Sequence, residues 1–532
     1  NTADGVRLTW QDEFSEIYVY NLRGNARTQG ERRRQEGDGI FGEGSRTGVA
    51  ITILVKRRNQ RGQAKVYYSE VDDYLSRREK LNILTDEISV EETLFDRIVP
   101  NVHGDWVNQR DDAYLDYQEI GDAKTKGKTD SGAVFILFSG GLKTNRDVWC
   151  YGFSRSKVAG NMQRMIGNYN SQVSARKTSK TADIDPTKLS WNRQLFKDLD
   201  REKTHQFNDA ALQLAVYRPF MKQIVYFDRS MNDMIYQMPR IFPSQRQPNI
   251  AFGAIGRGAT SGFSLLMTPL LPDLEFVSKA QWFPLYTWEP IEDDGSMFSL
   301  SDGRDWAETA TEFSGVFDFS KPISQQVPME VDGYRRVDNI TDATLTAYRH
   351  HYQDILNPEG EKISKEDIFF YVYALLHHPE YREKYEADLK KMLPRIPKVK
   401  DFWAYSNIGR VLADLHVNYE RAHPYPSVHM DWSLHTPEDV WKKYHVEKLA
   451  WGKLPGKRSK DFTTLIFNDY LTIRDIPAEA NDYKVGGRSP LEWMVDRYRI
   501  KTDKKSGITN DPNDYCKEIN DPAYIADLVG KL

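Results

Sequence analysis

The segments 17-IYVYNL-22 and 49-VAITILV-55 are short, rich in β-branched residues and almost wholly apolar. This pattern is typical of strands that are covered on both faces in an α/β sheet. A third run of strand-forming residues follows at 64-AKVYYSEV-71. The sequence therefore predicts that residues 1–90 belong to an α/β sheet in which the first two runs are central strands.

A charged helix is predicted over residues 74–84, directly after the third run. Asp72 and Asp73 precede it, and either carboxylate can accept hydrogen bonds from the free amides at a helix start. One such helix is too few to cover a sheet. The chain also begins with Asn1 and not with Met, so we expect a fragment or a processed chain that lacks its beginning.

The connection between the first two strands, residues 21–48, carries six arginines and seven glycines in 28 positions. Glycines let backbone amides approach a ligand, and guanidinium groups pair with phosphate oxygens. A solvated surface loop explains the same composition. Gly37, Gly39 and Gly42 match the GxGxxG spacing, but a dinucleotide site needs a strand before the glycines and a helix after them. Because a predicted strand follows instead, we expect no dinucleotide site here.

Length, charge and cysteine content limit the function classes. The 532 residues leave room for three or four folding units. Net charge is -4, from 73 basic and 77 acidic residues. The protein as a whole therefore does not attract a polyanion, and a polyanion would have to bind a local basic patch. The longest apolar run, residues 368–376, is roughly half as long as a bilayer-spanning helix, so no membrane association is expected. Two cysteines favour a reducing compartment, and the cytoplasm is the expected location.

Two further regions are predicted downstream of residue 90. Residues 91–360 contain short aromatic and apolar runs separated by Pro, Gly and Asn, which is typical of a mostly β region. Helix signals dominate residues 361–532. The clearest is a capping box of Ser364 and Asp367 before an apolar run that predicts a buried helix.

Basic residues in the β-rich region are candidate contacts to nucleic acid. Lys143 and Arg146 follow two glycines and can reach phosphates, although a polar turn between strands explains them almost as well. Arg218 lies in 217-YRPF-220, where aromatic and basic side chains alternate as they do in proteins that stack on bases. For the aromatic side chains themselves, burial in a β core is the favoured interpretation.

Several segments together resemble one family. The run 18-YVYNLRGNARTQGERRRQEGDGIFGEGSRTGVAITILVKR-57 is similar to the later part of the adenine methyltransferase domain of Type ISP restriction-modification enzymes, the single-polypeptide translocating group. Further pieces resemble the C-terminal target-recognition region of that family, in the family's order: 142-LKTNRDVWCYGFS-154, 217-YRPF-220, 283-FPLY-286, 367-DIFFYVYALLHHPEYREKY-385, 394-PRIP-397 and 485-VGGRSPLEW-493.

The resemblance implies an α/β remnant of a Rossmann-like methyltransferase sheet, followed by an α+β target-recognition region that is β-rich and then helical. It also implies upstream nuclease, ATP-dependent translocase, coupler and methyltransferase domains in the same polypeptide. S-adenosylmethionine would serve the methyltransferase, and ATP and Mg²⁺ the motor and nuclease. The tetrapeptide [DN]PP[FY], which holds the target adenine in such enzymes, does not occur in this sequence. The chain alone is therefore expected to be inactive and to bind no cofactor.

The resemblance also suggests one residue that contacts the base. Phe41 occupies a position similar to that of the aromatic residue that stacks on a flipped-out base in related adenine methyltransferases. Packing in the core is the alternative for this side chain. Arg32, Arg33, Arg34 and Arg46 are candidate backbone-phosphate contacts because of their chemistry alone.

The function expected from these observations is sequence-specific recognition of duplex DNA for an enzyme that methylates adenine and cleaves unmodified DNA. Two alternatives stay open. One is a protein-interaction scaffold without DNA-modifying activity, and the other is a methyltransferase completed by a separate chain.

Overall fold

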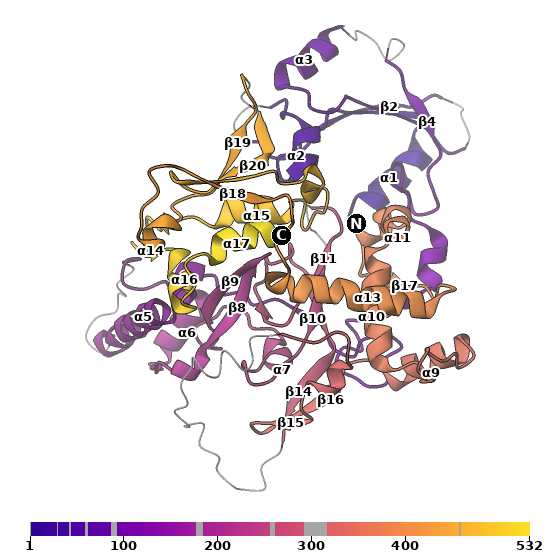
Figure 1. Cartoon of the computed structure of the whole chain (residues 1–532). Helices are drawn as coiled ribbons and strands as arrows, with labels where there is room; N and C mark the ends of the chain where they lie inside the picture. The colour runs from indigo at the N-terminus through magenta and orange to yellow at the C-terminus, as the bar shows by residue number, and fades with distance from the viewer. Residues whose placement is uncertain are drawn as a thin grey trace.

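The computed structural model describes residues 2–28, 30–41, 44–58, 62–86, 93–176, 185–255, 261–291, 316–456 and 459–532. Figure 1 shows the first sheet of the chain at one end of the molecule, next to a larger body that holds the remaining sheets and helices. Within these residues, no helix combines the length and apolar character that crossing a membrane requires.

The opening part is a mixed sheet of four strands in the order β2-β1-β3-β4. β1 runs antiparallel to β2 and parallel to β3. Ile17 of β1 and Val66 of β3 are fully buried and pack with Trp106 in a small core. The elements are α1 (Thr2–Glu13), β1 (Glu16–Asn21), α2 (Gly30–Glu36), β2 (Ala50–Val55), β3 (Lys65–Glu70), α3 (Arg77–Asp86) and β4 (Asp96–Ile98).

The prediction that both apolar runs form central strands is wrong for the second one. β2 is at the edge of the sheet, and its side chains Ile51 and Ile53 are each 41 % exposed. β1, in contrast, has a strand on either side. An apolar run therefore gave the strand correctly but not its place in the sheet, which depends on what packs against it.

The helix that follows β3 starts later than predicted. The side chain of Ser76 accepts a hydrogen bond from the backbone of Glu79 (3.3 Å), and the Ser76 backbone donates to the Glu79 carboxylate (2.7 Å). Asp73 instead pairs with Arg23, and the chain turns at Tyr74 in the left-handed region (φ 66°). This turn separates Asp73 from the helix, which explains why neither predicted aspartate is the cap.

Two sheets of four strands form the middle of the chain, in the orders β11-β10-β13-β6 and β12-β8-β9-β7. Both strands of the β8–β9 hairpin are almost wholly buried, and α5 packs against β7 and β9. The region also contains the 21-residue helix α5, so it is mixed α/β and not mostly β as predicted. The elements are β6 (Ser139–Gly140), α4 (Asp147–Cys150), β7 (Tyr151–Gly152), α5 (Arg155–Ala175), α6 (Arg193–Asp200), β8 (Leu212–Arg218), β9 (Met221–Tyr226), α7 (Met238–Ile241), β10 (Ala251–Ala254), β11 (Leu265–Thr268), β12 (Leu271–Pro272) and β13 (Gln281–Pro284).

Two long helices, α10 and α13, lie against each other in the next part (Figure 1). The predicted capping box is present, with Ser364 Oγ accepting from the Asp367 amide (3.1 Å), and α10 is buried on all sides. A Cβ at Gly409 would stand 2.0 Å from the carbonyl oxygen of Phe370, so only glycine permits this approach. The elements are β5 (Gln118–Glu119), β14 (Tyr286–Pro290), β15 (Glu330–Val331), β16 (Tyr334–Asp338), α9 (Asp342–His351), α10 (Lys365–His377), α11 (Pro379–Lys384), α12 (Glu386–Leu389), β17 (Arg395–Ile396) and α13 (Phe402–Val417).

The last part of the chain is less helical than predicted, because it contains a sheet of four strands in the order β18-β21-β20-β19. Most of β20 is exposed or half-buried, so its apolar signal in the sequence is weak. The elements are β18 (His429–Trp432), α14 (Val440–Lys443), β19 (Ala450–Lys453), β20 (Lys460–Ile466), β21 (Leu471–Arg474), α15 (Pro490–Arg497), β22 (Lys501–Thr502), β23 (Thr509–Asn510), α16 (Asn513–Glu518) and α17 (Tyr524–Lys531).

Two large hydrophobic cores lie in the body of the molecule. One contains residues between 137 and 529, and the other contains residues between 114 and 413. Each core thus draws on segments from both sides of residue 360. The predicted boundaries near residues 90 and 360 stay predictions.

Candidate nucleic-acid interface

Three of the predicted phosphate contacts lie on one short helix. The stretch between β1 and β2 contains α2, whose residues Arg32 and Arg34 are exposed. The side chain of Arg33 points toward the segment that follows α2, where it donates a hydrogen bond to the carbonyl oxygen of Gly37 (2.5 Å). The guanidinium group of Arg32 lies 3.8 Å from a carboxylate oxygen of Glu386. The guanidinium groups of Arg32 and Arg34 are therefore held at the surface by a helix and do not lie in an irregular loop.

The end of this helix is fixed by a buried lysine. Lys80 of α3 is fully buried, and its ammonium group donates to the carbonyl oxygens of Glu36 (2.7 Å) and Asp38 (2.9 Å). Burial lowers the pKa of Lys80. Gly37 has φ +62°, and a Cβ there would stand 2.2 Å from the carbonyl oxygen of Leu75. The segment after α2 is thus held tightly against the start of α3.

Phe41 lies beyond this fixed segment and is 61 % exposed, so the structure does not place it in a core. Arg46 is also exposed, with a 3.4 Å hydrogen bond to the carbonyl oxygen of Ala26. Gly37 and Gly39 follow a helix, and Gly42 lies outside the described residues. This order differs from the strand–turn–helix order of a dinucleotide site, as the sequence indicated.

The other three candidate cations meet at a cleft of about 480 Å³ in the middle of the chain. Lys143, Arg146 and Arg218 contribute to its wall, although Arg218 is far from the other two in sequence. The cleft is lined by residues from five segments: Lys143 to Trp149, Pro186 and Ser190, Arg218, Asp273 to Glu275, and Asp503 with Lys505 and Ser506. Sequence patterns gave no indication that the last two segments join this site.

One of these cations, Arg146, is buried, and Arg218 is mostly covered, so neither lies on an open surface. Arg218 pairs with Asp273 and lies over the ring of Tyr217, with 4.0 Å between its guanidinium carbon and the ring centre. Arg146 is only 4 % exposed. Burial raises the pKa of Asp273 to about 7, against the opposing effect of Arg218. The predicted polar turn at residues 143–146 is therefore part of a packed site, and its proposed phosphate role stays a prediction.

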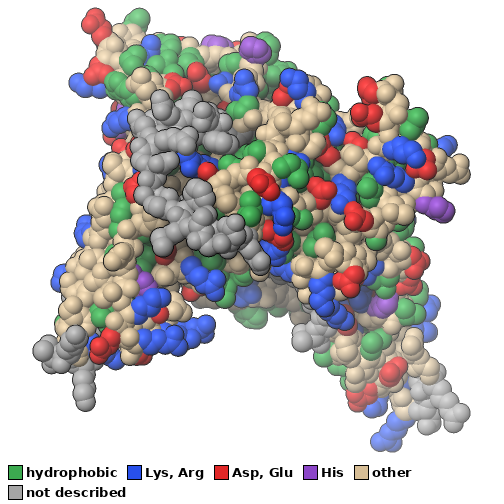
Figure 2. Space-filling view, turned by 90° about the horizontal axis from the view of Figure 1, so that it is seen from below, with side chains coloured by type: hydrophobic (Ala, Val, Ile, Leu, Met, Phe, Trp, Pro, Cys, Tyr) green, Lys and Arg blue, Asp and Glu red, His purple; other side chains and the backbone are tan. Residues whose placement is uncertain are grey.

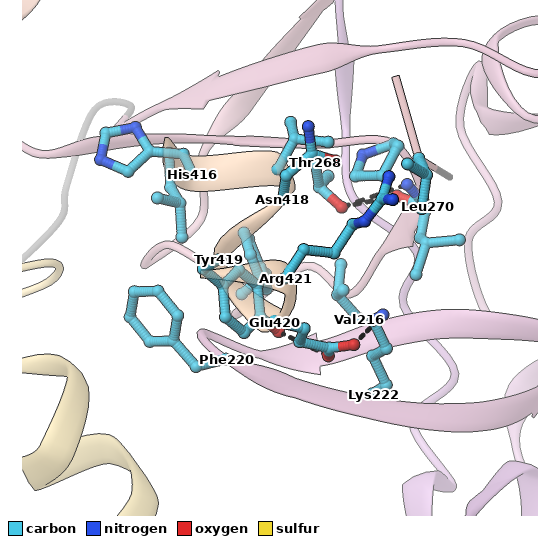
Figure 3. A pocket seen from close by; sticks show the side chains of 15 residues that line it. Val216, Phe220, Lys222, Thr268, Leu270, His416, Asn418, Tyr419, Glu420 and Arg421 are labelled. Atoms are coloured by element: carbon cyan, nitrogen blue, oxygen red, sulfur yellow. Dashed lines mark hydrogen bonds and ion pairs between the residues drawn. The ribbon is translucent and has the colours of Figure 1, made fainter. Parts of the chain in front are cut away.

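The aromatic residues around Arg218 belong to the core, which confirms the favoured interpretation. Phe220 is 5 % exposed and Tyr226 is fully buried. Lys222 of the same hairpin is also engaged, because its ammonium group donates to Glu420 (2.8 Å) in a smaller pocket of about 50 Å³ (Figure 3). Glu420 also accepts from the hydroxyl of Tyr524 (2.9 Å). These groups satisfy one another, so we assign this pocket a structural role.

The charges at the surface do not form one large basic area on the face drawn in Figure 2. Lys and Arg side chains alternate there with Asp and Glu side chains. This distribution agrees with the small net charge of -4. Among the described residues, no group of three or more His, Cys, Asp or Glu side chains could hold a metal ion.

A family model for the Type ISP C-terminal specificity domain matches residues 133–528, which is most of the chain. The chain belongs to the Type ISP family. The cleft with Lys143, Arg146 and Arg218 lies inside the matched region, whereas α2 and Phe41 precede it. A comparison with curated protein sequences finds no match.

Solved structures of two Type ISP enzymes and of DrdV are similar over the whole of this chain. A nuclease-deletion mutant of LlaGI, in complex with a DNA substrate mimic, is 34 % identical with a TM-score of 0.75. The ATP-dependent enzyme LlaBIII, bound to DNA, is 31 % identical with a TM-score of 0.77. The DrdV–DNA complex, solved by cryoEM, is 29 % identical with a TM-score of 0.74. The chain spans 43 %, 31 % and 47 % of those three chains, respectively.

Proposed function

We propose that this chain recognises a specific sequence in duplex DNA, as the specificity part of a Type ISP restriction-modification enzyme. The observation that carries the proposal is similarity over 100 % of the chain to two enzymes, 34 % and 31 % identical, that were solved with DNA or a DNA mimic. The match to the Type ISP specificity domain over residues 133–528 supports the same function.

The exposed arginines of α2 are the proposed contacts to the DNA backbone. Arg32 and Arg34 face solvent, and the segment that follows them is held by Lys80. Guanidinium groups pair well with phosphate oxygens, and such contacts weaken as salt rises because bound counterions are released. We further propose that Phe41 stacks on an extrahelical base, since its exposed ring is available for stacking.

The opening sheet is, in this proposal, the end of a Rossmann-like methyltransferase sheet. Support comes from its mixed strand directions and from the edge position of β2. The missing strands, the translocase and the nuclease would belong to the same polypeptide, because the related solved chains are more than twice as long. S-adenosylmethionine would bind in the upstream part of the methyltransferase. We assign it no residue of this chain, because Gly37 and Gly39 follow a helix and not a strand.

The cytoplasm is the proposed location. Cys150 and Cys516 are both buried as free thiols. Burial raises the pKa of each to about 12, so neither forms a reactive thiolate near neutral pH. Free structural thiols of this kind suit a reducing compartment.

The test is selection of binding sites from a random duplex library with the full chain, followed by titration of the selected duplex over a salt series. We expect one enriched motif and an affinity that falls steeply with salt. A library that shows no enrichment, together with no shift of any duplex at low salt, contradicts the proposal and favours the scaffold alternative. If a motif is enriched but the affinity does not depend on salt, only the proposed phosphate contacts are contradicted, and the recognition of DNA is not.

A further inference from the structure

A basic β-hairpin formed by β19 and β20 lies in the C-terminal part of the chain. The eight residues 453-KLPGKRSK-460 contain four basic residues and no acidic one. Lys453 is the last residue of β19, and Lys460 is the first residue of β20. Because the net charge of the chain is -4, a polyanion needs a local concentration of positive charge such as this one.

Two of these cations lie opposite each other without a compensating acid. Lys453 and Lys460 are direct partners in the antiparallel register, and both are exposed. Neither makes an ion pair within the part of the chain that the structure describes. The next acid in the sequence, Asp461, accepts from the backbone (2.9 Å) and the hydroxyl (2.6 Å) of Thr463. Since like charges directly opposite each other destabilise a β-ladder, the hairpin keeps an unfavourable pair that a polyanion would neutralise.

The base of the hairpin is fixed in the protein, whereas its tip is exposed. Trp451 is 6 % exposed in one of the two large cores, and its ring lies edge-on to that of Phe462, with 5.1 Å between ring centres. The backbone amide of Leu454 donates to the carbonyl oxygen of Ser459 (3.1 Å). Leu454 and Gly456 are exposed. The hairpin is therefore a two-stranded ribbon that is held at its base and presents its tip to solvent.

The shape and the direction of the hairpin suit a DNA duplex. The major groove of B-DNA admits a two-stranded β-ribbon, and lysine side chains on such a ribbon can reach backbone phosphates. Figure 1 shows the hairpin projecting from the body on the side where the opening sheet lies. The exposed arginines Arg32 and Arg34 belong to α2, which connects two strands of that sheet. The lysine pair and these arginines thus belong to elements on the same side of the body.

We propose that the β19–β20 hairpin enters a groove of duplex DNA, with Lys453 and Lys460 as contacts to the phosphates beside it. This inference rests on the function proposed above and adds a second element to its DNA-binding surface. The phosphates supply the negative charge that the lysine pair lacks. An acidic protein surface offers the same charge, but not a groove that matches a two-stranded ribbon.

The first experiment titrates the selected duplex over a salt series with the full chain that carries Lys453→Gln and Lys460→Gln. We expect the affinity to fall roughly tenfold and the slope of log affinity against log salt to decrease by about 2, since two phosphate contacts are lost. An unrelated duplex should be weakened by the same factor, because phosphate contacts carry no sequence information. The Tm should not fall, because a pair of like charges has been removed.

Two variants are the controls for this experiment. Lys453→Arg with Lys460→Arg keeps both charges and should keep the wild-type slope. Lys197→Gln with Lys203→Gln removes two exposed lysines at α6, away from the hairpin (Figure 1), and should keep the wild-type affinity. An unchanged affinity and slope in the Gln variant of the hairpin overturn this inference and leave the proposed function intact. A wild type that binds no duplex contradicts both.

The second experiment tests whether the tip lies on the DNA. Cys150 and Cys516 are the only cysteines in the sequence, and both are buried, so a Leu454→Cys variant can be labelled at position 454 alone with an iron–EDTA group that cleaves nearby deoxyribose. We expect cleavage within a few base pairs at one position relative to the selected motif. Lys197→Cys, labelled in the same way, should give none. Absent or evenly spread cleavage from position 454, with duplex binding intact, overturns the inference.

Discussion

The hydroxyl oxygen of Tyr373 lies 2.6 Å from Nδ1 of His416, which joins α10 to α13 inside the molecule. The other ring nitrogen of His416 lies 3.1 Å from the hydroxyl of Tyr483, in the segment before α15. A second imidazole, that of His377, is 5.3 Å away between ring centres. One histidine thus connects the helical part of the chain to the C-terminal part.

The stability of the chain should fall in acid because of these two histidines. Burial lowers the pKa of His416 to about 3 and that of His377 to about 4. Between these values and the ordinary pKa near 6.5, the unfolded chain binds protons that the folded chain does not, so stability decreases as pH falls. The free energy of unfolding should drop by up to about 1.4 kcal/mol per pH unit for each histidine below pH 6.

Denaturant titrations at pH 7, 6, 5 and 4 check this expectation. His416→Gln keeps a side chain that can accept from Tyr373 but cannot be charged, so its stability should depend less on pH than that of the wild type. Identical pH profiles of the two proteins would show that His416 does not titrate in this way.

The exposed arginines of α2 should contribute to DNA binding. Replacing Arg32 and Arg34 together with Ala should lower duplex affinity and reduce the slope of log affinity against log salt by about 1 for each phosphate that is no longer neutralised. Arg33→Ala removes a hydrogen bond to Gly37, so it should lower Tm instead. If the double variant kept the wild-type affinity and slope, α2 would not contact phosphates.

Phe41 should tolerate substitution in the free protein. Because its ring is 61 % exposed, Phe41→Ala should change the free energy of unfolding by no more than about 0.5 kcal/mol. If the ring stacks on an extrahelical base, the same variant should weaken binding to a duplex in which the target base faces an abasic position or a mismatch, and Phe41→Trp should preserve that binding. A large decrease of stability in Phe41→Ala would instead indicate core packing.

The close approach of α10 and α13 should require glycine at position 409. Gly409→Ala places a methyl group against the carbonyl of Phe370, so we expect a decrease of about 1–3 kcal/mol in the free energy of unfolding. Gly160→Ala in α5 is the matched control, because nothing lies within 4 Å of a Cβ there. The control should gain roughly 0.5–1 kcal/mol from the higher helix propensity of Ala. A stabilised Gly409→Ala would mean that the two helices do not approach each other this closely.

Local patterns predicted the local features well. The apolar runs before and after the arginine-rich stretch became β1 and β2, and Ser364 with Asp367 formed the expected capping box. These features depend on residues within a few positions of one another, so the sequence contains the information directly. The exposed and half-buried strand β20 gave a weaker pattern, and its sheet was missed.

The order of residues by itself determined where the first strands and the buried helix form, and its resemblance to Type ISP enzymes was sufficient to indicate the family. Only the tertiary structure decided that β2 is an edge strand, that the side chain of Arg146 is buried without a partner among the described residues, and that five segments line one cleft. The physical reason is that burial and pairing arise from contacts between residues up to several hundred positions apart, which no local pattern encodes.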